Sequence, residues 1–243
     1  MSSIINIYVK FLNETNKGNH NMDSTQKRQK NVETLQHVLS LLENSQSKKA
    51  LEVLQSAHFI DDFALIKKQI EAEILVSLNE HNRAECAYLG IIREHPENTD
   101  TKFALSQLYQ KNGRLSQART ILDEVIALDA AHFMAWNNKG NIERSLKNYD
   151  AAIECYKKSL EIEPGYTVAM NNLCLIYSET QRYQEVIDLG LQAIEDNPQT
   201  ISVYEIMHNA YIEMNHTQEA YDLIDLAIKQ CGEDPRLTTL SAG

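Results

Sequence analysis

The chain has 243 residues, of which 43% are hydrophobic and 23% are charged, close to the averages of globular proteins. Its net charge is −11 and its pI is about 5.2, so the protein repels phosphate backbones and shows no basic stripe for nucleic acid. The acidic balance either favours encounter with basic partners or serves only to keep an extended chain in solution.

The first 30 residues are predicted to form a separate segment, largely a disordered linker. Residues 4–12 are mostly apolar but too few to span a bilayer, and they lack the basic flank and clear cleavage site of a secretory signal. Residues 13–30 are polar and are typical of a linker. Met22 offers an alternative start, in which case residues 1–21 would not belong to the natural protein. We expect a cytoplasmic protein with no membrane span.

A small residue recurs every 34 residues in the rest of the chain. Alanine stands at residues 50, 84, 118, 152 and 220, and apolar Val186 occupies the skipped position. Pro96, Pro164 and Pro198 share a second phase, and proline marks where one unit stops because it cannot continue a helix. A 34-residue period is typical of a helix–turn–helix unit that stacks into a solenoid.

The period divides most of the chain into six contiguous units. These are residues 31–64, 65–98, 99–132, 133–166, 167–200 and 201–234. Residues 235–243 restart the phase and are predicted to form a short C-terminal helix or an incomplete cap. Because this cap is short, we expect the surface around Tyr221, Ile224 and Ile228 to stay partly apolar. Another copy of the chain, a partner or further sequence would then cover it.

The unit at residues 133–166 resembles the tetratricopeptide repeat, TPR. The family's residues at matching positions are Trp136, Gly140, Ala152, Tyr156 and Pro164. The resemblance extends over residues 31–234. It implies an all-α fold, a right-handed superhelical solenoid of stacked antiparallel helix pairs in six 34-residue units.

Some units depart from the family pattern. Glu143 replaces the usual bulky residue at position 11 of its unit, and Gly190 replaces one at position 24. His37 and His208 stand at positions 7 and 8, where apolar or small residues are expected.

Nothing in the sequence predicts catalysis. The glycine-rich dinucleotide motif, the P-loop, the nucleophile elbow and the H-E-x-x-H motif are all absent, and the eight histidines show no metal-ligand spacing. The four cysteines form no C-x-x-C pair and favour a reduced compartment, with a disulfide as the alternative. We therefore expect no enzyme activity, no cofactor and no metal site.

By the resemblance, the first helix of each unit lines a concave groove through positions 2, 5, 6, 9, 12 and 13. From residue 133 onward these positions carry Asn137, Asn138, Asn141, Arg144, Asn171, Asn172 and Asn209. Asparagine is a mediocre helix former, so paired asparagines in mid-helix break a local rule, and such breaks concentrate at functional sites. Each amide offers a donor and an acceptor to an extended peptide backbone. The alternative is a polar surface without a ligand.

Two TPR subfamilies give contrasting templates for this groove. Asn138 and Asn172, both at position 6, resemble the asparagine ladder of O-linked N-acetylglucosamine transferases, here only two rungs long. Another subfamily clamps the C-terminal carboxylate of chaperones, but all three basic residues are missing from the matching positions here. Without them the charge-assisted bonds of a clamp are lost, so the sequence argues against it.

The first two units present a different groove surface. Their groove positions include an apolar set, Val32, Leu35, Leu39, Leu42, Ile66 and Val76. An apolar wall either seats an amphipathic partner helix or is covered by residues 4–12 of the same chain.

The predicted function is a non-catalytic scaffold or adaptor that binds an extended peptide or a partner helix in its groove. The alternative is a substrate-recruiting arm of a glycosyltransferase- or sulfotransferase-like enzyme whose catalytic domain is absent from this chain. A homo-oligomer through the C-terminal unit is a further expectation. A lipobox or signal peptide would favour a part in a bacterial envelope or secretion assembly, and the sequence shows neither.

Overall fold

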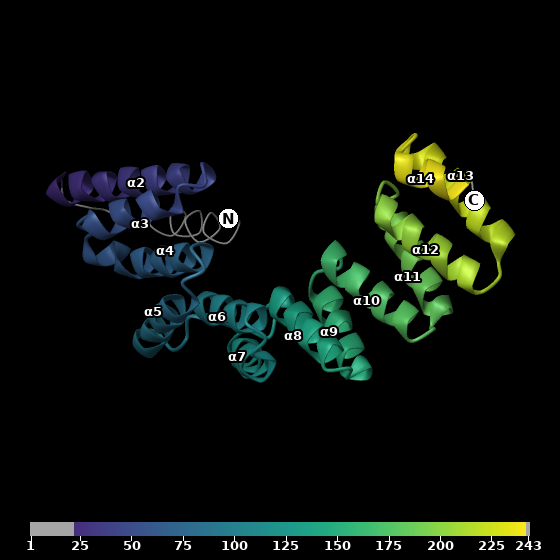
Figure 1. Ribbon diagram of the computed structural model, residues 1–243, viewed down its shortest axis with the longest axis horizontal. Helices are drawn as coiled ribbons and strands as arrows, with labels where there is room; N and C mark the ends of the chain where they lie inside the picture. The colour runs from purple at the N-terminus through teal and green to yellow at the C-terminus, as the bar shows by residue number, and fades with distance from the viewer. Residues whose placement is uncertain (1–21, 242–243) are drawn as a thin grey trace. The chain divides into compact units, whose positions relative to one another are not determined.

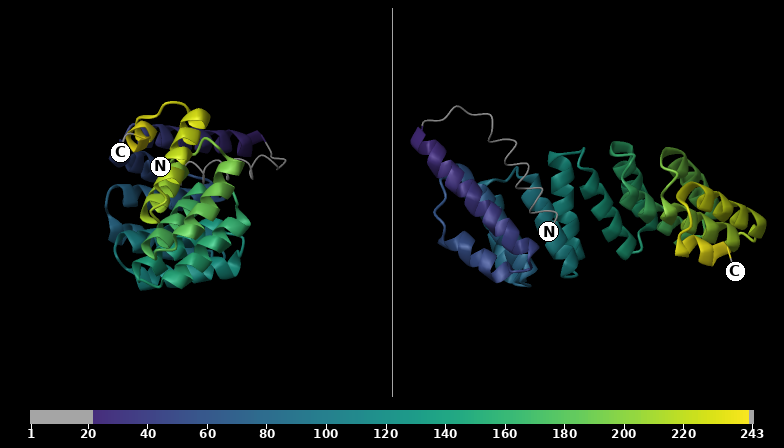
Figure 2. Two further views of the ribbon diagram at one scale, coloured as in Figure 1. Left: turned by 90° about the vertical axis from the view of Figure 1, so that its right-hand side faces the viewer. Right: turned by 90° about the horizontal axis from the view of Figure 1, so that it is seen from above.

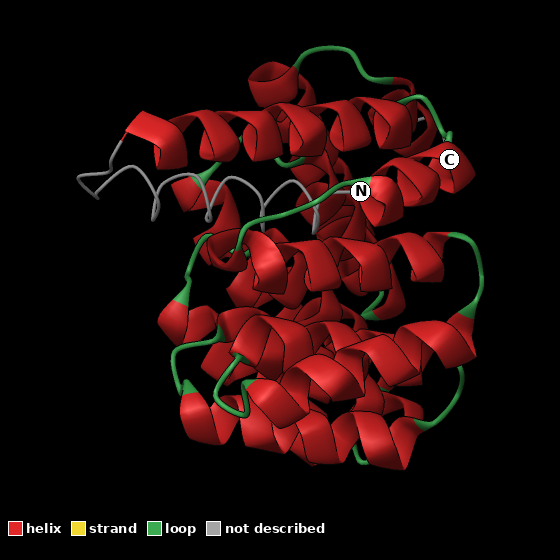
Figure 3. Ribbon diagram, turned by 90° about the vertical axis from the view of Figure 1, so that its left-hand side faces the viewer, coloured by secondary structure: helices red, strands yellow, loops and turns green. Residues whose placement is uncertain are grey.

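The computed structural model describes residues 22–241, and every regular element in that part of the chain is a helix (Figure 3). The predicted all-α class is confirmed. The chain divides into two compact units, Met1–Glu124 and Val125–Gly243, each of which holds several 34-residue repeats. From here on, the first and second unit mean these two parts of the chain.

Figure 1 labels the helices of both units. The first unit holds α2 (Met22–Glu43), α3 (Ser47–Ser56), the 3₁₀ helix η1 (Asp61–Phe63), α4 (Ala64–Ser77), α5 (His81–Glu94) and α6 (Thr99–Lys111). The boundary between the units falls within α7 (Leu115–Leu128). The second unit holds α8 (Phe133–Ser145), α9 (Tyr149–Ile162), α10 (Thr167–Glu179), α11 (Tyr183–Asp196), α12 (Ile201–Glu213), α13 (Thr217–Cys231) and α14 (Pro235–Ser241).

The recurring small residue lies where helices pack. Within the second unit, α8 packs on α9, α9 on α10, α10 on α11 and α11 on α12. All five phased alanines and Val186 have no exposed surface. A small side chain at this position lets neighbouring helices approach closely, and any added methylene must displace a packed neighbour.

A left-handed turn ends the first helix of each pair, again every 34 residues. The residues with positive φ at these turns are Ser45, Asn79, Gly113, Lys147, Gln181 and Asn215. At the end of α8, for example, the Asn148 amide donates to the Glu143 carbonyl (2.8 Å) and the Lys147 amide donates to the Arg144 carbonyl (2.9 Å). This pair of bonds is the Schellman motif, which satisfies carbonyls left open at a helix end. Glycine, its preferred residue, occupies only the turn at 113, so the motif is hidden in the sequence.

These turns give a first prediction about stability. Lys147 is exposed at φ 62°, a conformation that glycine adopts freely and lysine does not. Lys147→Gly should therefore stabilise the protein by about 0.5–1 kcal/mol, measured by urea unfolding. Lys147→Ala, which has a Cβ, should bring no such gain, and Asn215→Gly should bring less because asparagine tolerates this region. A less stable Lys147→Gly variant would contradict the argument.

The N-terminal boundary differs from the prediction. Residues 22–30, expected as linker, form the first turns of α2. Contacts distant in sequence hold this helix: Asn31 Nδ2 donates to the His58 carbonyl (2.9 Å), and the Ile60 amide donates to Asn31 Oδ1 (3.1 Å). Arg28 also lies 3.6 Å from Asp62. Local polarity alone predicts a linker because it does not include these partners. The predictions for residues 1–21 concern a segment outside the described residues.

Packing explains the glycine that matches the family pattern, Gly140, and the one that departs from it, Gly190. A Cβ on Gly140 would lie 2.6 Å from the Tyr156 ring, so only glycine lets α8 approach α9 here. A Cβ on Gly190 would overlap the side chain of Met207, which fills the space of the missing bulky residue. The position-11 departure, Glu143, is buried and accepts a hydrogen bond from Asn148 Nδ2 (2.8 Å).

The C-terminal helix covers more surface than the sequence predicts. Helix α14 packs on α13 and α12 at the yellow end of the chain in Figure 2. Leu237 has no exposed surface, and neither has Ile224 on α13. The expectation of an open surface is therefore wrong for Ile224, while Tyr221 and Ile228 are half-buried. Leu237 and Leu240 on this short helix both pack on the core and cover part of the end of the array.

Candidate functional site

The predicted asparagines lie on the first helices of successive pairs in the second unit. Asn137, Asn138 and Asn141 belong to α8, Asn171 and Asn172 to α10, and Asn209 to α12. Neighbouring hydrophobic residues hold these helices: Ile142 on α8 and Leu173 on α10 are buried in the core. The rigid packing therefore compensates for the weak helix propensity of asparagine.

Three of these amides form one hydrogen-bonded chain between α8 and α10. Asn172 Nδ2 donates to Asn137 Oδ1 (2.9 Å), and Asn137 Nδ2 donates to Asn138 Oδ1 (3.3 Å). Asn137 is only 2% exposed, which corrects the expectation that it faces the groove. It lies beneath the surface and links the two position-6 asparagines.

Each end of this amide chain keeps one open group. Among the described residues, Asn138 Nδ2 has no acceptor and Asn172 Oδ1 has no donor. Asn171 Oδ1, next to it on α10, is buried and also lacks a partner. We call Asn138, Asn171 and Asn172 the amide face. Its open groups at the two ends of the amide chain, the Asn138 Nδ2 donor and the Asn172 Oδ1 acceptor, complement the C=O and N–H groups of a peptide unit.

Two of the remaining polar residues of the predicted site, Asn141 and Arg144, make contacts within the fold. Asn141 Oδ1 accepts from the Tyr156 hydroxyl (2.9 Å), and Arg144 Nε donates to Glu179 Oε2 (3.0 Å). Hydrogen bonds from Arg144 lower the pKa of the Glu179 carboxyl. Their ion pair therefore stabilises the fold above the ordinary carboxyl pKa and weakens as the pH falls through the lowered value, by a small amount because both groups are partly exposed. Asn209 is exposed.

The predicted apolar groove of the first unit is largely interior. Leu35, Leu42 and Ile66 are buried, with at most 5% exposure. Val32, Leu39 and Val76 are half-buried. The six residues therefore do not form an open apolar wall, and the proposed cover by residues 4–12 lies outside the described residues.

Two exposed apolar residues at groove-facing positions of the repeat were not predicted from the sequence. Leu175 on α10 is 42% exposed, and Ile212 on α12 is 39% exposed. Leu175 stands four residues after Asn171 and therefore shares its helix face. Both residues occupy groove-facing positions of the repeat, so their position in the repeat could have identified them. The sequence prediction used only asparagines, because these break the rule of helix propensity.

The rest of the described chain offers little for chemistry. No group of three or more His, Cys, Asp or Glu side chains there is arranged to hold a metal ion. The four cysteines are free, and burial raises the pKa of Cys174 to about 12, so its thiol is unreactive. None of the described helices is both long enough and apolar enough to cross a membrane.

Comparisons with known proteins agree with this architecture. Residues 133–166 and 75–138 each match a tetratricopeptide repeat family model. Small glutamine-rich tetratricopeptide repeat-containing protein 2 from Mycosarcoma maydis is 29% identical over 105 residues, which cover 43% of this chain and 29% of that protein. The peroxisomal targeting signal receptor of Yarrowia lipolytica is 25% identical over 141 residues, 48% of this chain and 23% of the receptor. The chain thus spans less than a third of either relative.

Solved structures show the same fold. A tetratricopeptide repeat protein from Parabacteroides merdae matches 86% of this chain and 82% of its own with a TM-score of 0.63 at 18% identity. YrrB, described as a TPR protein with an unusual peptide-binding site, matches 81% of this chain and 98% of its own with a TM-score of 0.57 at 14% identity. At these identities the likeness concerns the fold, and it confirms the predicted TPR-like architecture.

Proposed function

Because the chain belongs to the tetratricopeptide repeat superfamily, we propose that it is a non-catalytic scaffold or adaptor that holds an extended peptide segment of a partner protein on its amide face. The observation that carries this proposal is the hydrogen-bonded amide chain with open groups at Asn138 Nδ2 and Asn172 Oδ1. Its middle member, Asn137, is buried and fixes both outer amides before a ligand arrives. Such pre-organisation reduces the ordering cost of binding.

The chemistry of the amide face favours backbone recognition. An amide donor and an amide acceptor pair equally well with the main chain of any residue except proline, so they select an extended segment rather than a sequence. Selectivity then comes from neighbours such as the exposed side chain of Leu175, which suits an apolar residue of the peptide. Exposed Glu213 on α12 and the overall charge of −11 favour a peptide with basic flanks.

The test begins with the identity of the peptide. A pull-down with the full chain, followed by tiled peptides from the captured protein, supplies a ligand for calorimetry. Asn138→Ala with Asn172→Ala should weaken its binding by about 1–3 kcal/mol, the scale of lost buried hydrogen bonds. Asn82→Ala, at an exposed position of α5, is the matched control and should leave affinity unchanged.

The peptide itself gives the sharper control. N-methylation of the one amide that meets Asn172 Oδ1 should cost as much affinity as the double substitution, whereas alanine at the same peptide residue should cost less. Full affinity in the double variant, or a response to side chains only, would remove the amide face from the proposal.

The cytoplasm is the proposed location, and the proposed state is a monomer rather than a homo-oligomer through the C-terminal repeat. The buried Leu237 gives a test of the latter, since it closes the C-terminal helix within one chain. Light scattering should therefore show a monomer for the full chain, and Leu237→Asp should expose apolar surface and promote association. Dimers of the unaltered chain would instead support self-association through another surface.

A further inference from the structure

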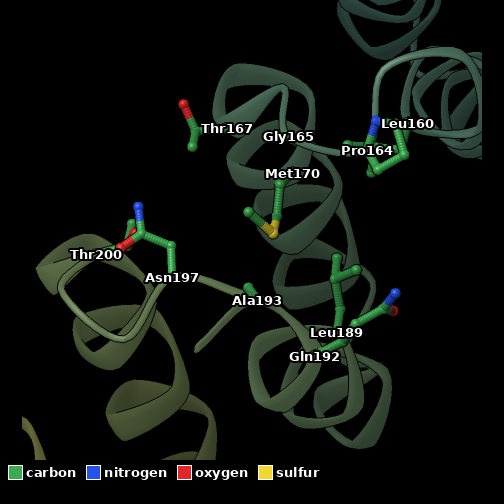
Figure 4. Close-up of a pocket in the computed structure, with 10 residues that line it drawn as sticks. All are labelled: Leu160, Pro164, Gly165, Thr167, Met170, Leu189, Gln192, Ala193, Asn197 and Thr200. Carbon is green, nitrogen blue, oxygen red and sulfur yellow. The ribbon is translucent and has the colours of Figure 1, made fainter. Parts of the chain in front are cut away.

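A pocket opens beside the N-terminal end of α10, in the second unit. Its volume is about 270 Å³, and it is lined by the ends of α9 and α10, by α11 and by the loops before α10 and α12. Figure 4 shows Met170 at the centre of the lining residues. Apolar side chains there include Leu160, Leu189 and Ala193. The pocket shares no residue with the amide face.

In the preceding repeat an aromatic pair occupies the equivalent positions. Phe133 and Tyr166 pack edge to face with ring centroids 4.8 Å apart. The residues 34 positions later are Thr167 and Thr200, and both line the pocket. The pocket therefore lies where the preceding repeat has two aromatic residues and this repeat has two threonines.

A hydrogen bond is missing at the same place. In the preceding repeat the Trp136 indole N–H donates to the Ala130 carbonyl (3.1 Å). In the following repeat the Tyr204 hydroxyl donates to the Pro198 carbonyl (3.0 Å). The equivalent pair here is Met170 and Pro164, and a thioether has no proton to donate. Among the described residues no donor reaches the Pro164 carbonyl, which belongs to a residue that lines the pocket.

We infer that this pocket receives an aromatic side chain with a hydrogen-bond donor, a tryptophan or a tyrosine, from a partner protein. The ring would lie against Met170 and Leu189, and its N–H or O–H would donate to the Pro164 carbonyl. Sulfur–aromatic contact favours such a neighbour for Met170. The volume also lies below the roughly 300–1,000 Å³ of pockets that take drug-sized ligands, which favours a single side chain. This contact is separate from the backbone recognition proposed for the amide face.

The test uses the full chain labelled with ¹³C in the methionine methyl groups. The probes are N-acetyl-tryptophanamide, N-acetyl-tyrosinamide and N-acetyl-phenylalaninamide. Each should shift the Met170 methyl signal saturably while the exposed Met134 methyl stays unchanged. The tryptophan and tyrosine probes should bind about fivefold more tightly than the phenylalanine probe, the scale of one net hydrogen bond. This comparison needs no substitution.

A filled variant supplies the control. Thr167→Phe with Thr200→Tyr rebuilds the aromatic pair of the preceding repeat and keeps Met170 as the reporter, and it should reduce probe binding at least tenfold. Asn138→Ala with Asn172→Ala should leave probe binding unaffected, which separates this proposal from the amide face. No saturable shift at Met170, equal binding of all three probes, or full binding by the filled variant would each overturn the inference. Tighter binding of free tryptophan than of its blocked amide would assign the pocket to a small metabolite and also contradict it.

Discussion

Gly140→Ala is expected to destabilise the protein by about 1–3 kcal/mol, although alanine is the better helix former. The added Cβ would lie 2.6 Å from Cε1 of the Tyr156 ring. That ring has little freedom to move, because Tyr156 is fully buried and its hydroxyl donates to Asn141 Oδ1 at 2.9 Å. Either α8 shifts away from α9 or the tyrosine loses its hydrogen bond. Trp136, the single tryptophan, lies on α8 and reports the unfolding of this repeat by fluorescence.

The matched control is the same substitution in another helix. Gly90 lies within α5, and a Cβ there would meet no atom within 4 Å. Gly90→Ala should therefore stabilise the protein by roughly 0.5–1 kcal/mol, the ordinary gain for alanine in a helix interior. If the same substitution lowers stability at Gly140 and raises it at Gly90, the difference comes from the contact between the helices and not from helix propensity. Equal effects at both positions would show that Tyr156 does not fix the spacing of α8 and α9.

Asn137→Ala is the second substitution with a large expected effect. It removes the middle of the amide chain and leaves Asn172 Nδ2 and Asn138 Oδ1 without their partners. The expected loss is about 1–3 kcal/mol in the free energy of unfolding, the cost of broken buried hydrogen bonds. Peptide affinity should fall too, since the outer amides are no longer held in place.

Asn209→Ala is the control that separates the loss of the hydrogen-bonded amide chain from the general effect of replacing asparagine by alanine. Asn209 occupies a groove-facing phase on α12 but is exposed, so its replacement should change stability by no more than about 0.5 kcal/mol. Both variants exchange asparagine for alanine in a helix and share the same propensity gain. If urea unfolding gave the same stability for both, the amide chain would contribute nothing to the fold.

The sequence predicts well the features that depend on one helix face. The 34-residue period alone predicts that Ala152 lies at a helix contact, because close helix packing requires a small side chain wherever it occurs. The inward position of Asn137 could not be predicted in this way. Whether a residue between two faces turns inward depends on the rotation of α8 relative to α10, and the partner that decides it, Asn172, lies 35 residues away.

The amino-acid sequence alone does not predict the pocket either, for a related reason. Thr167 and Thr200 are unremarkable residues in their own helix and loop. Their meaning appears only when the structure shows that Phe133 and Tyr166 contact each other one period earlier. Likewise, residues 22–30 look like a linker until the contacts of α2 with the loop after α3 are known.

The left-handed turns bear on how such chains diverge. Family models match this chain between residues 75 and 166, and the turn recurs over the longer range from Ser45 to Asn215. Its bonds join backbone atoms, and serine, asparagine, lysine, glutamine and glycine all occupy its key position. Selection can therefore exchange nearly every side chain at the turn without losing the period. At these turns the backbone conformation keeps the 34-residue period where the amino-acid identity does not.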